Sequence, residues 1–215
     1  MKTITIQVYN YAELAPAARE KARCDFLTDD NGALSDGWWS EVFEDVVPVA
    51  AVLGIDIDMD RSGEPAVYFT GFGIQGQCAS FTARYTYRKG ASDEIRAHAP
   101  TDGVLHSIAD ALQAAQRRYF YRLEATVRPS RVYGVDVDVT LQDDPWRDAG
   151  DAGQEIRAQM EAFANWVFRQ LQREHESRTS EDFADECLSG SDRLYYRDGG
   201  VVSSRVLLHR EGTAC

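Results

Sequence analysis

Residues 79–88 alternate between two kinds of side chain, and this pattern limits what the glycine-rich segment before them can be. Ala79 and Phe81 have one parity, whereas Thr82 and Arg84 have the other. A period of two that is rich in aromatic and Thr residues is typical of a half-exposed strand. The segment is therefore predicted to be a strand and not a helix.

The preceding segment, VYFTGFGIQG at residues 67–76, contains the pattern G-x-G-x-x-G. This fingerprint binds a dinucleotide only when its glycines open a helix whose N-terminus faces the pyrophosphate. Because a strand follows, we interpret Gly71 to Gly76 as the bend between two antiparallel strands. No second strand–helix unit offers an acidic residue for a ribose, so no cofactor is predicted.

The remaining patterns predict an α+β fold, a mainly antiparallel sheet covered by amphipathic helices. We expect one domain over residues 1–190, with 191–215 as a C-terminal edge strand or tail. Pro48 is expected to kink or split its helix. The expected helices are 13–27, 36–54, 91–99, 101–123, 154–176 and 180–190. The expected strands are 3–11, 53–60, 66–72, 78–90, 124–130, 131–142 and 192–200.

The net charge of the 215-residue chain is −12, and it is unevenly distributed. Ten acidic residues lie between Asp29 and Glu64, where the only basic residue is Arg61. Such a region repels a phosphate backbone and attracts a basic partner, which argues against direct nucleic-acid binding. The alternative is a solvated face that keeps the protein soluble.

Composition also bears on the compartment. No run of about 18 apolar residues exists, and residues 1–10 begin as a strand pattern and not as a signal peptide. The four cysteines are far apart and form no C-x-x-C pair. We therefore expect a soluble cytoplasmic protein with reduced thiols and no membrane association.

Asp56, Asp58 and Asp60 resemble the start of a calcium-binding loop. The sixth and twelfth positions of that loop require Gly and Glu, but they are Arg61 and Val67 here. We interpret the three acids as the exposed side of a strand, and no metal is predicted.

Asp136 and Asp138 have the same alternating pattern and the same interpretation. A metal shared between these two acidic strands is possible if the strands are neighbours. The four histidines lack ligand spacing, and no hydrolase, kinase or zinc-protease motif occurs. The sequence therefore assigns no catalytic residue and favours a binding protein over an enzyme.

One basic-aromatic cluster is present, and two interpretations of it are open. Such clusters bind single-stranded nucleic acid by stacking and charge. The favoured alternative is that the aromatic rings are core and the arginines pair with the surplus acids. The cluster comprises Arg117, Arg118, Tyr119, Phe120, Tyr121 and Arg122.

Four stretches together resemble a family of tailed-phage and prophage accessory proteins, some labelled antitoxins of toxin–antitoxin systems. They are TITIQVYNYAELAPAAREKAR at 3–23, WWSEVFEDV at 38–46, YFTGFGIQGQCASFTARYTYRKGA at 68–91 and LHSIADALQAAQRRYFYRLEATV at 105–127. The resemblance covers roughly residues 1–190. It implies a phage accessory protein in the cytoplasm of a bacterial host.

Together, the charge and the resemblance predict an acidic binding protein that inhibits a host defence system by protein–protein contact, such as an anti-CRISPR-like protein. Its partner would be a host protein or ribonucleoprotein complex with a basic surface. The alternatives are an antitoxin that neutralises a toxin, and a small enzyme with dispersed carboxylates. Adjacent Trp38 and Trp39 cannot both point inward, so one of them could anchor a partner. The expected partner-binding residues are Asp29, Asp30, Asp36, Trp38, Glu41, Glu44, Asp45, Phe72, Gln75 and Gln77.

Overall fold

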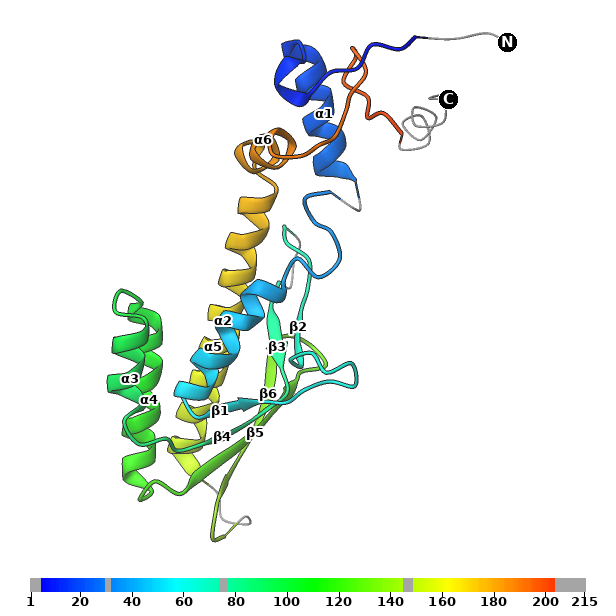
Figure 1. The fold of residues 1–215 in the computed structure, drawn as a ribbon. Helices are drawn as coiled ribbons and strands as arrows, with labels where there is room; N and C mark the ends of the chain where they lie inside the picture. The colour runs from blue at the N-terminus through cyan, green and yellow to red at the C-terminus, as the bar shows by residue number, and fades with distance from the viewer. Residues whose placement is uncertain (1–4, 30–31, 74–76, 145–148, 204–215) are drawn as a thin grey trace, which may run out of the picture. The chain divides into compact units, whose positions relative to one another are not determined.

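The computed structural model describes residues 5–29, 32–73, 77–144 and 149–203, and its elements are labelled in Figure 1. Helices and mainly antiparallel strands confirm the predicted α+β class. The chain divides into two compact units. Unit 1 combines Met1–Trp38 with Glu174–Cys215, and unit 2 is Trp39–Arg173. A single domain over residues 1–190 stays a prediction, because compact units need not fold separately.

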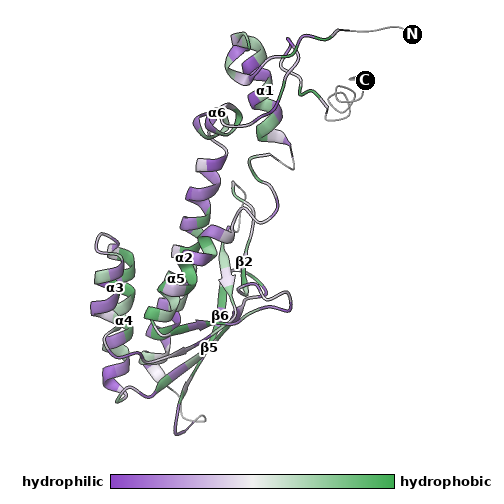
Figure 2. Cartoon of the chain, viewed as in Figure 1, coloured by the Kyte–Doolittle hydropathy of each residue, from purple (hydrophilic) through white to green (hydrophobic). Residues whose placement is uncertain are grey.

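Unit 2 contains most of the regular structure. Its helices are α2 (Ser40–Val52), α3 (Ala91–His98), α4 (Gly103–Arg118) and most of α5 (Gly150–Arg178). Its strands are β1 (Ile55–Ile57), β2 (Val67–Phe69), β3 (Ala79–Phe81), β4 (Ala83–Thr86), β5 (Leu123–Pro129) and β6 (Val135–Leu141). Figure 2 shows hydrophobic residues interleaved with hydrophilic ones along α2, α4 and α5, as amphipathic helices require.

The four-stranded sheet of unit 2 has the antiparallel order β1-β4-β5-β6. Its inner face is apolar, with Ile55, Tyr85, Leu123 and Val137 all buried. The buried amide of Gln116 fixes α4 to this face, because it donates to the Leu123 carbonyl (2.7 Å) and accepts from the Leu123 N–H (3.1 Å). The helices therefore cover one face and leave the other polar.

The β2–β3 pair confirms the interpretation of the glycine-rich segment. These strands pair antiparallel, with Val67 opposite Phe81 and Phe69 opposite Ala79. The Thr70 N–H then donates to the Cys78 carbonyl (3.1 Å) across the bend. The strand after the glycines shows that no helix N-terminus faces a cofactor there.

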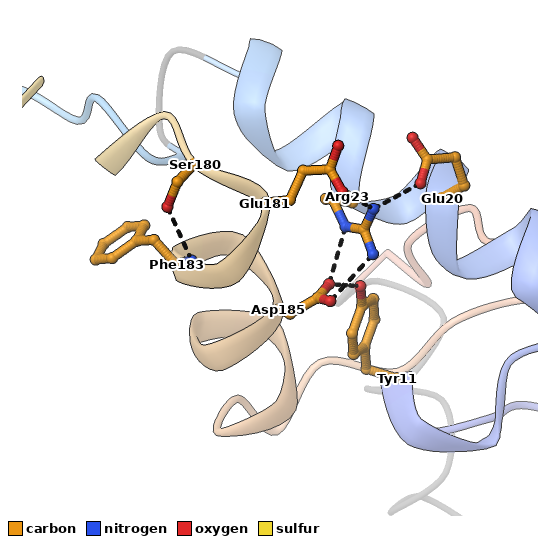
Figure 3. A network of polar contacts seen from close by, with 7 residues as sticks. All are labelled: Tyr11, Glu20, Arg23, Ser180, Glu181, Phe183 and Asp185. Atoms are coloured by element: carbon orange, nitrogen blue, oxygen red, sulfur yellow. Dashed lines mark hydrogen bonds and ion pairs between the residues drawn. The ribbon is translucent and has the colours of Figure 1, made fainter. Parts of the chain in front are cut away.

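Unit 1 is built from both parts of the chain that lie outside unit 2. It contains the 3₁₀ turn η1 (Tyr11–Glu13), α1 (Pro16–Thr28) and α6 (Glu181–Ser189), together with the end of α5. Its core brings together Leu14, Ala18, Ala22, Phe26, Ala184, Leu188 and Tyr195. Polar contacts join the same elements, with Asp185 of α6 between Arg23 of α1 and Tyr11 of η1 (Figure 3).

Three local predictions need correction. Residues 5–8 form no strand, and Tyr9 makes a single bridge to Tyr195. Residues 192–200 likewise form isolated bridges and a turn. Of the two outcomes expected for Pro48, a kink or a split of its helix, the split does not occur, because α2 is continuous from Ser40 to Val52. Pro48 is exposed, so water can hydrogen-bond the carbonyl that loses its helical partner.

Candidate partner-binding surface

The exposed side of α2 carries three carboxylates, and we name Glu41, Glu44 and Asp45 the acidic stripe. Their spacing of three and four residues places them on one helix face, and all three are exposed. Val42, Phe43 and Val46 on the other side are buried. Burial of those apolar residues fixes the orientation of α2, and the carboxylates are therefore displayed to solvent.

The charge of this stripe is not neutralised within its own helix, because α2 contains no Lys or Arg. Glu44 and Asp45 also form no ion pair with any residue that the structure describes. Several arginines pair with acids elsewhere in the sequence, as in Arg96–Asp110 (2.6 Å) and Arg88–Glu94 (2.8 Å). Ion pairing among the described residues therefore leaves Glu44 and Asp45 as a source of uncompensated negative potential.

Other exposed carboxylates between Asp29 and Glu64 also lack an ion pair within the described ranges. These residues are Asp36, Asp56, Asp58 and Glu64. Asp60 differs, because its carboxylate accepts from the Ser62 hydroxyl (2.6 Å) and backbone N–H (2.7 Å) and closes a turn. These hydrogen bonds lower the pKa of Asp60, so its carboxylate stabilises the turn.

Partly buried aromatic rings lie at the start of α2. Trp39 meets Phe69 edge-on, with centroids 5.8 Å apart, and Phe69 stacks on Phe72 at 5.9 Å. Phe72 in turn contacts Phe168 of α5 at 5.3 Å. This cluster joins the segment before α2, strand β2, the bend after β2 and α5 within unit 2. Phe72, which sequence reasoning assigned to partner binding, is thus half-buried in an aromatic cluster.

The other predicted binding residues differ in their surroundings. Asp29 and Asp36 are exposed and belong to unit 1, whereas the acidic stripe belongs to unit 2. Trp38 is only 8% exposed, and its ring meets His175 edge-on at 5.9 Å. Trp38 is therefore a core side chain with little surface to offer a partner. Gln77 is half-buried.

Two of the predicted residues, Asp30 and Gln75, lie outside the described residues.

The polar face of the four-stranded sheet is a second surface, which sequence reasoning did not propose as a site. A hollow of about 450 Å³ lies on it, and Arg84, Thr126 and Arg128 are among its lining residues. Arg84 lies opposite Thr126, two residues before Arg128 on β5, so the two arginines are diagonal neighbours. Neither makes an ion pair within the described chain. The alternation of apolar and polar side chains around residues 84 and 128 is the sequence pattern from which this face could have been predicted.

The same sheet order separates the carboxylates that an enzyme could have used. Asp56 is on β1 and Asp138 is on β6, at opposite edges of the sheet, with β4 and β5 between them. Strand spacing places such residues about 14 Å apart, three times about 4.8 Å. A metal shared between the two acidic strands is therefore excluded, which corrects that alternative.

The favoured interpretation of the basic-aromatic cluster is partly wrong. Arg118 pairs with Glu155 and Arg122 with Asp143, as expected. Phe120 and Tyr121, however, are 77% and 42% exposed and do not belong to the core. They follow the end of α4, where the chain turns away from the apolar face.

Other functional groups give no site within the described ranges. No three His, Cys, Asp or Glu side chains come together as a metal would require. Cys24, Cys78 and Cys187 form no disulfide within the described residues. Among the described helices, none combines the length and the apolar composition needed to cross a membrane.

Comparison with known proteins identifies one family. The model of a domain of unknown function, DUF8835, matches residues 38–181, which include the whole of unit 2. No curated protein and no solved structure matches the chain. The acidic stripe, the aromatic cluster and the polar sheet face all lie within the matched region.

Proposed function

The chain belongs to the DUF8835 family, and we propose that it is an acidic binding protein that inhibits a bacterial defence system by protein–protein contact. The observation that carries the proposal is the acidic stripe, in which Glu44 and Asp45 are exposed without an ion pair among the described residues. Carboxylates displayed in this way attract a positively charged surface over about a Debye length, about 8 Å at physiological salt.

The partner that fits is a host protein or ribonucleoprotein complex with a basic surface. A complex that handles nucleic acid has such a surface, because it must neutralise phosphates. An acidic helix that occupies it excludes the nucleic acid by charge and by bulk. The resemblance to phage accessory proteins supports the bacterial cytoplasm as the compartment and a host defence complex as the class of partner.

The experiment uses phage plating on bacterial strains that each carry one defence system, with and without the full chain. We expect the chain to raise plating efficiency on at least one strain. The triple variant E41Q/E44Q/D45N removes the stripe, and we expect it to lose this effect. The matched control D136N/D138N/E161Q removes three exposed charges elsewhere in unit 2 and should keep it.

Binding of the defence complex is then measured with purified components after nuclease treatment. A contact made by the stripe weakens as salt rises from 50 to 500 mM, roughly in proportion to the number of charges engaged. Equal binding by the triple variant and the parent chain at every salt concentration would overturn the proposal. Protection from a toxin encoded beside the gene, without any effect on plating, would replace it with the antitoxin alternative.

A further inference from the structure

The end of α4 adopts a turn that normally requires glycine. The Tyr121 N–H donates to the Gln116 carbonyl (2.8 Å), and the Phe120 N–H donates to the Arg117 carbonyl (3.4 Å). These two bonds define a Schellman motif, whose residue after the C-cap takes left-handed angles. That residue is Phe120, with φ = 53°, and Tyr121 follows with φ = 62°.

Two bulky residues in succession in this region are unusual, because their Cβ atoms crowd the backbone. Tyr121 gains a contact in return, since its ring lies 4.4 Å from that of Tyr87. Phe120 gains little, because 77% of its surface is exposed. Strain that persists where the side chain is not buried indicates a function for that side chain. The turn displays the Phe120 ring, and folding alone does not explain the choice of residue.

A hollow of about 330 Å³ lies beside the ring. Some of the charged side chains that line it are paired with one another or with neighbours, and one is not. The hollow is lined by Arg118, Tyr119, Phe120, Arg122, Leu141, Asp143 and Asp144. Both arginines are already paired, Arg118 with Glu155 and Arg122 with Asp143 (2.7 Å). The exposed carboxylate of Asp144 has no ion pair in the described part of the chain. The charge left for a ligand is therefore negative.

We propose that this corner, which we name the Phe120 corner, binds an arginine side chain of the protein partner. The partner's guanidinium stacks on the Phe120 ring and pairs with the Asp144 carboxylate. Arg122 already lies over the ring, 5.8 Å from its centroid, and Phe120 is 77% exposed, so we assign the partner's guanidinium to the other face of the ring. Arginine fits better than lysine, because its planar group stacks and pairs at once. The proposal rests on the proposed function, since it names the group by which a basic partner is recognised.

The test uses the full ¹⁵N-labelled chain and three probes: a short arginine-glycine peptide, its lysine counterpart and oligo-dT. Backbone amide shifts locate each probe on the chain. The variants are F120G, which suits the left-handed position, and D144N. The control is V132A, which removes an exposed apolar side chain, 75% accessible, from the β5–β6 turn. Thermal unfolding of each variant is measured in parallel.

We expect the arginine peptide to shift amides around Phe120 and Asp144 and to bind more tightly than the lysine peptide. F120G and D144N should each weaken it about three- to fivefold, as the loss of an exposed cation–π contact or ion pair predicts. V132A should not change binding. F120G should keep or raise the unfolding midpoint, by about 2–4 °C, because glycine relieves the strain.

Three outcomes would overturn the proposal. One is oligo-dT binding at the corner in place of the arginine peptide, which would assign it to single-stranded nucleic acid. Another is a loss of folding in F120G, which would make Phe120 structural. The third is an arginine peptide that shifts only amides of the acidic stripe. In that case the proposed function survives, because plating and stripe binding are measured independently of the corner.

Discussion

Arg23 and Asp185 form a two-point contact across 162 positions of the sequence, with Nε–Oδ1 at 2.9 Å and Nη2–Oδ2 at 3.0 Å. The same Asp185 carboxylate accepts the Tyr11 hydroxyl, and Arg23 also contacts Glu20 (2.7 Å) and Glu181 (2.8 Å) (Figure 3). A planar guanidinium suits this bidentate geometry, which a lysine ammonium cannot reproduce. The contact therefore fixes α6 against α1 and η1 within unit 1.

Replacing Asp185 by Asn should lower stability in a pH-dependent way. Hydrogen bonds from Arg23 and then from Tyr11 lower the pKa of Asp185. A carboxyl with a lowered pKa stabilises the fold above its unfolded value, about 3.9, and this stability is lost as the pH falls through the folded value. We expect D185N to unfold a few degrees below the parent at pH 7, with the two midpoints converging below about pH 4.

The control for this series is D192N, whose carboxylate is exposed and has no ion pair within the described residues. Its midpoint should follow that of the parent chain at every pH. Thermal unfolding followed by circular dichroism from pH 7 to pH 2 provides the comparison. A difference for D185N that persists undiminished at pH 2 would show that the ionised carboxylate is not its source.

Two glycines have left-handed backbone angles, and replacing each of them by alanine should lower the free energy of unfolding by different amounts. At Gly54, with φ = 81°, a Cβ would lie 2.2 Å from the Thr86 carbonyl oxygen, whereas at Gly63, with φ = 87°, it would meet nothing within 4 Å. G63A should cost about 1–2 kcal/mol of unfolding free energy from the backbone angle alone. G54A should cost more, because α2 and β4 must also separate. Urea denaturation measures both, and equal losses would contradict the close approach.

The buried amide of Gln116 should make a large contribution to the free energy of unfolding. Its side chain is fully buried and also donates to the Tyr85 hydroxyl at 3.3 Å. Q116L would leave the N–H and C=O of Leu123 without their partner, at a cost of about 2–4 kcal/mol. Q113A, which removes a half-buried acceptor for Ser92, is the matched control and should cost less. Urea denaturation of both variants tests this order.

Asp102 has two roles at the start of α4, and a double-mutant cycle can separate them. Its Oδ1 caps the helix by accepting the Val104 and Leu105 N–H groups, and its Oδ2 accepts the Trp166 indole N–H at 2.7 Å. D102A should lose both contributions and W166F only the second. The two changes should therefore be non-additive, with a coupling of about 1–2 kcal/mol in the free energy of unfolding. Additive losses would mean that the indole contact contributes nothing.

Sequence reasoning succeeded where the structural signal is local. The helix predicted at 180–190 corresponds to α6, whose cap Ser180 accepts the Phe183 N–H at 3.2 Å, and the helix predicted at 101–123 contains α4, which Asp102 caps. The strands predicted at 124–130 and 131–142 likewise correspond to the paired strands β5 and β6. In each case the partners are close in sequence, so the pattern alone carries the information.

The features that the sequence did not predict depend on contacts between residues that are distant in sequence. Nothing near Tyr9 indicates that it pairs with Tyr195, and nothing near Phe120 indicates a left-handed turn in place of the core. The exposure of the acidic stripe followed from helix periodicity. The absence of an ion pair at Glu44 and Asp45 among the described residues did not follow from it, because that depends on where arginines such as Arg96 and Arg122 find their partners.

The bridge between Tyr9 and Tyr195 also has a consequence for synthesis on the ribosome. The strands of the unit 2 sheet, the last of which ends at Leu141, are all synthesised well before Tyr195 is made, so the sheet can form first. The α1 side chains Ala18, Ala22 and Phe26 stay uncovered until α6, which packs against them, has been synthesised. During that interval a nascent chain exposes an apolar helix face that the finished protein conceals, and chaperones are expected to bind it then.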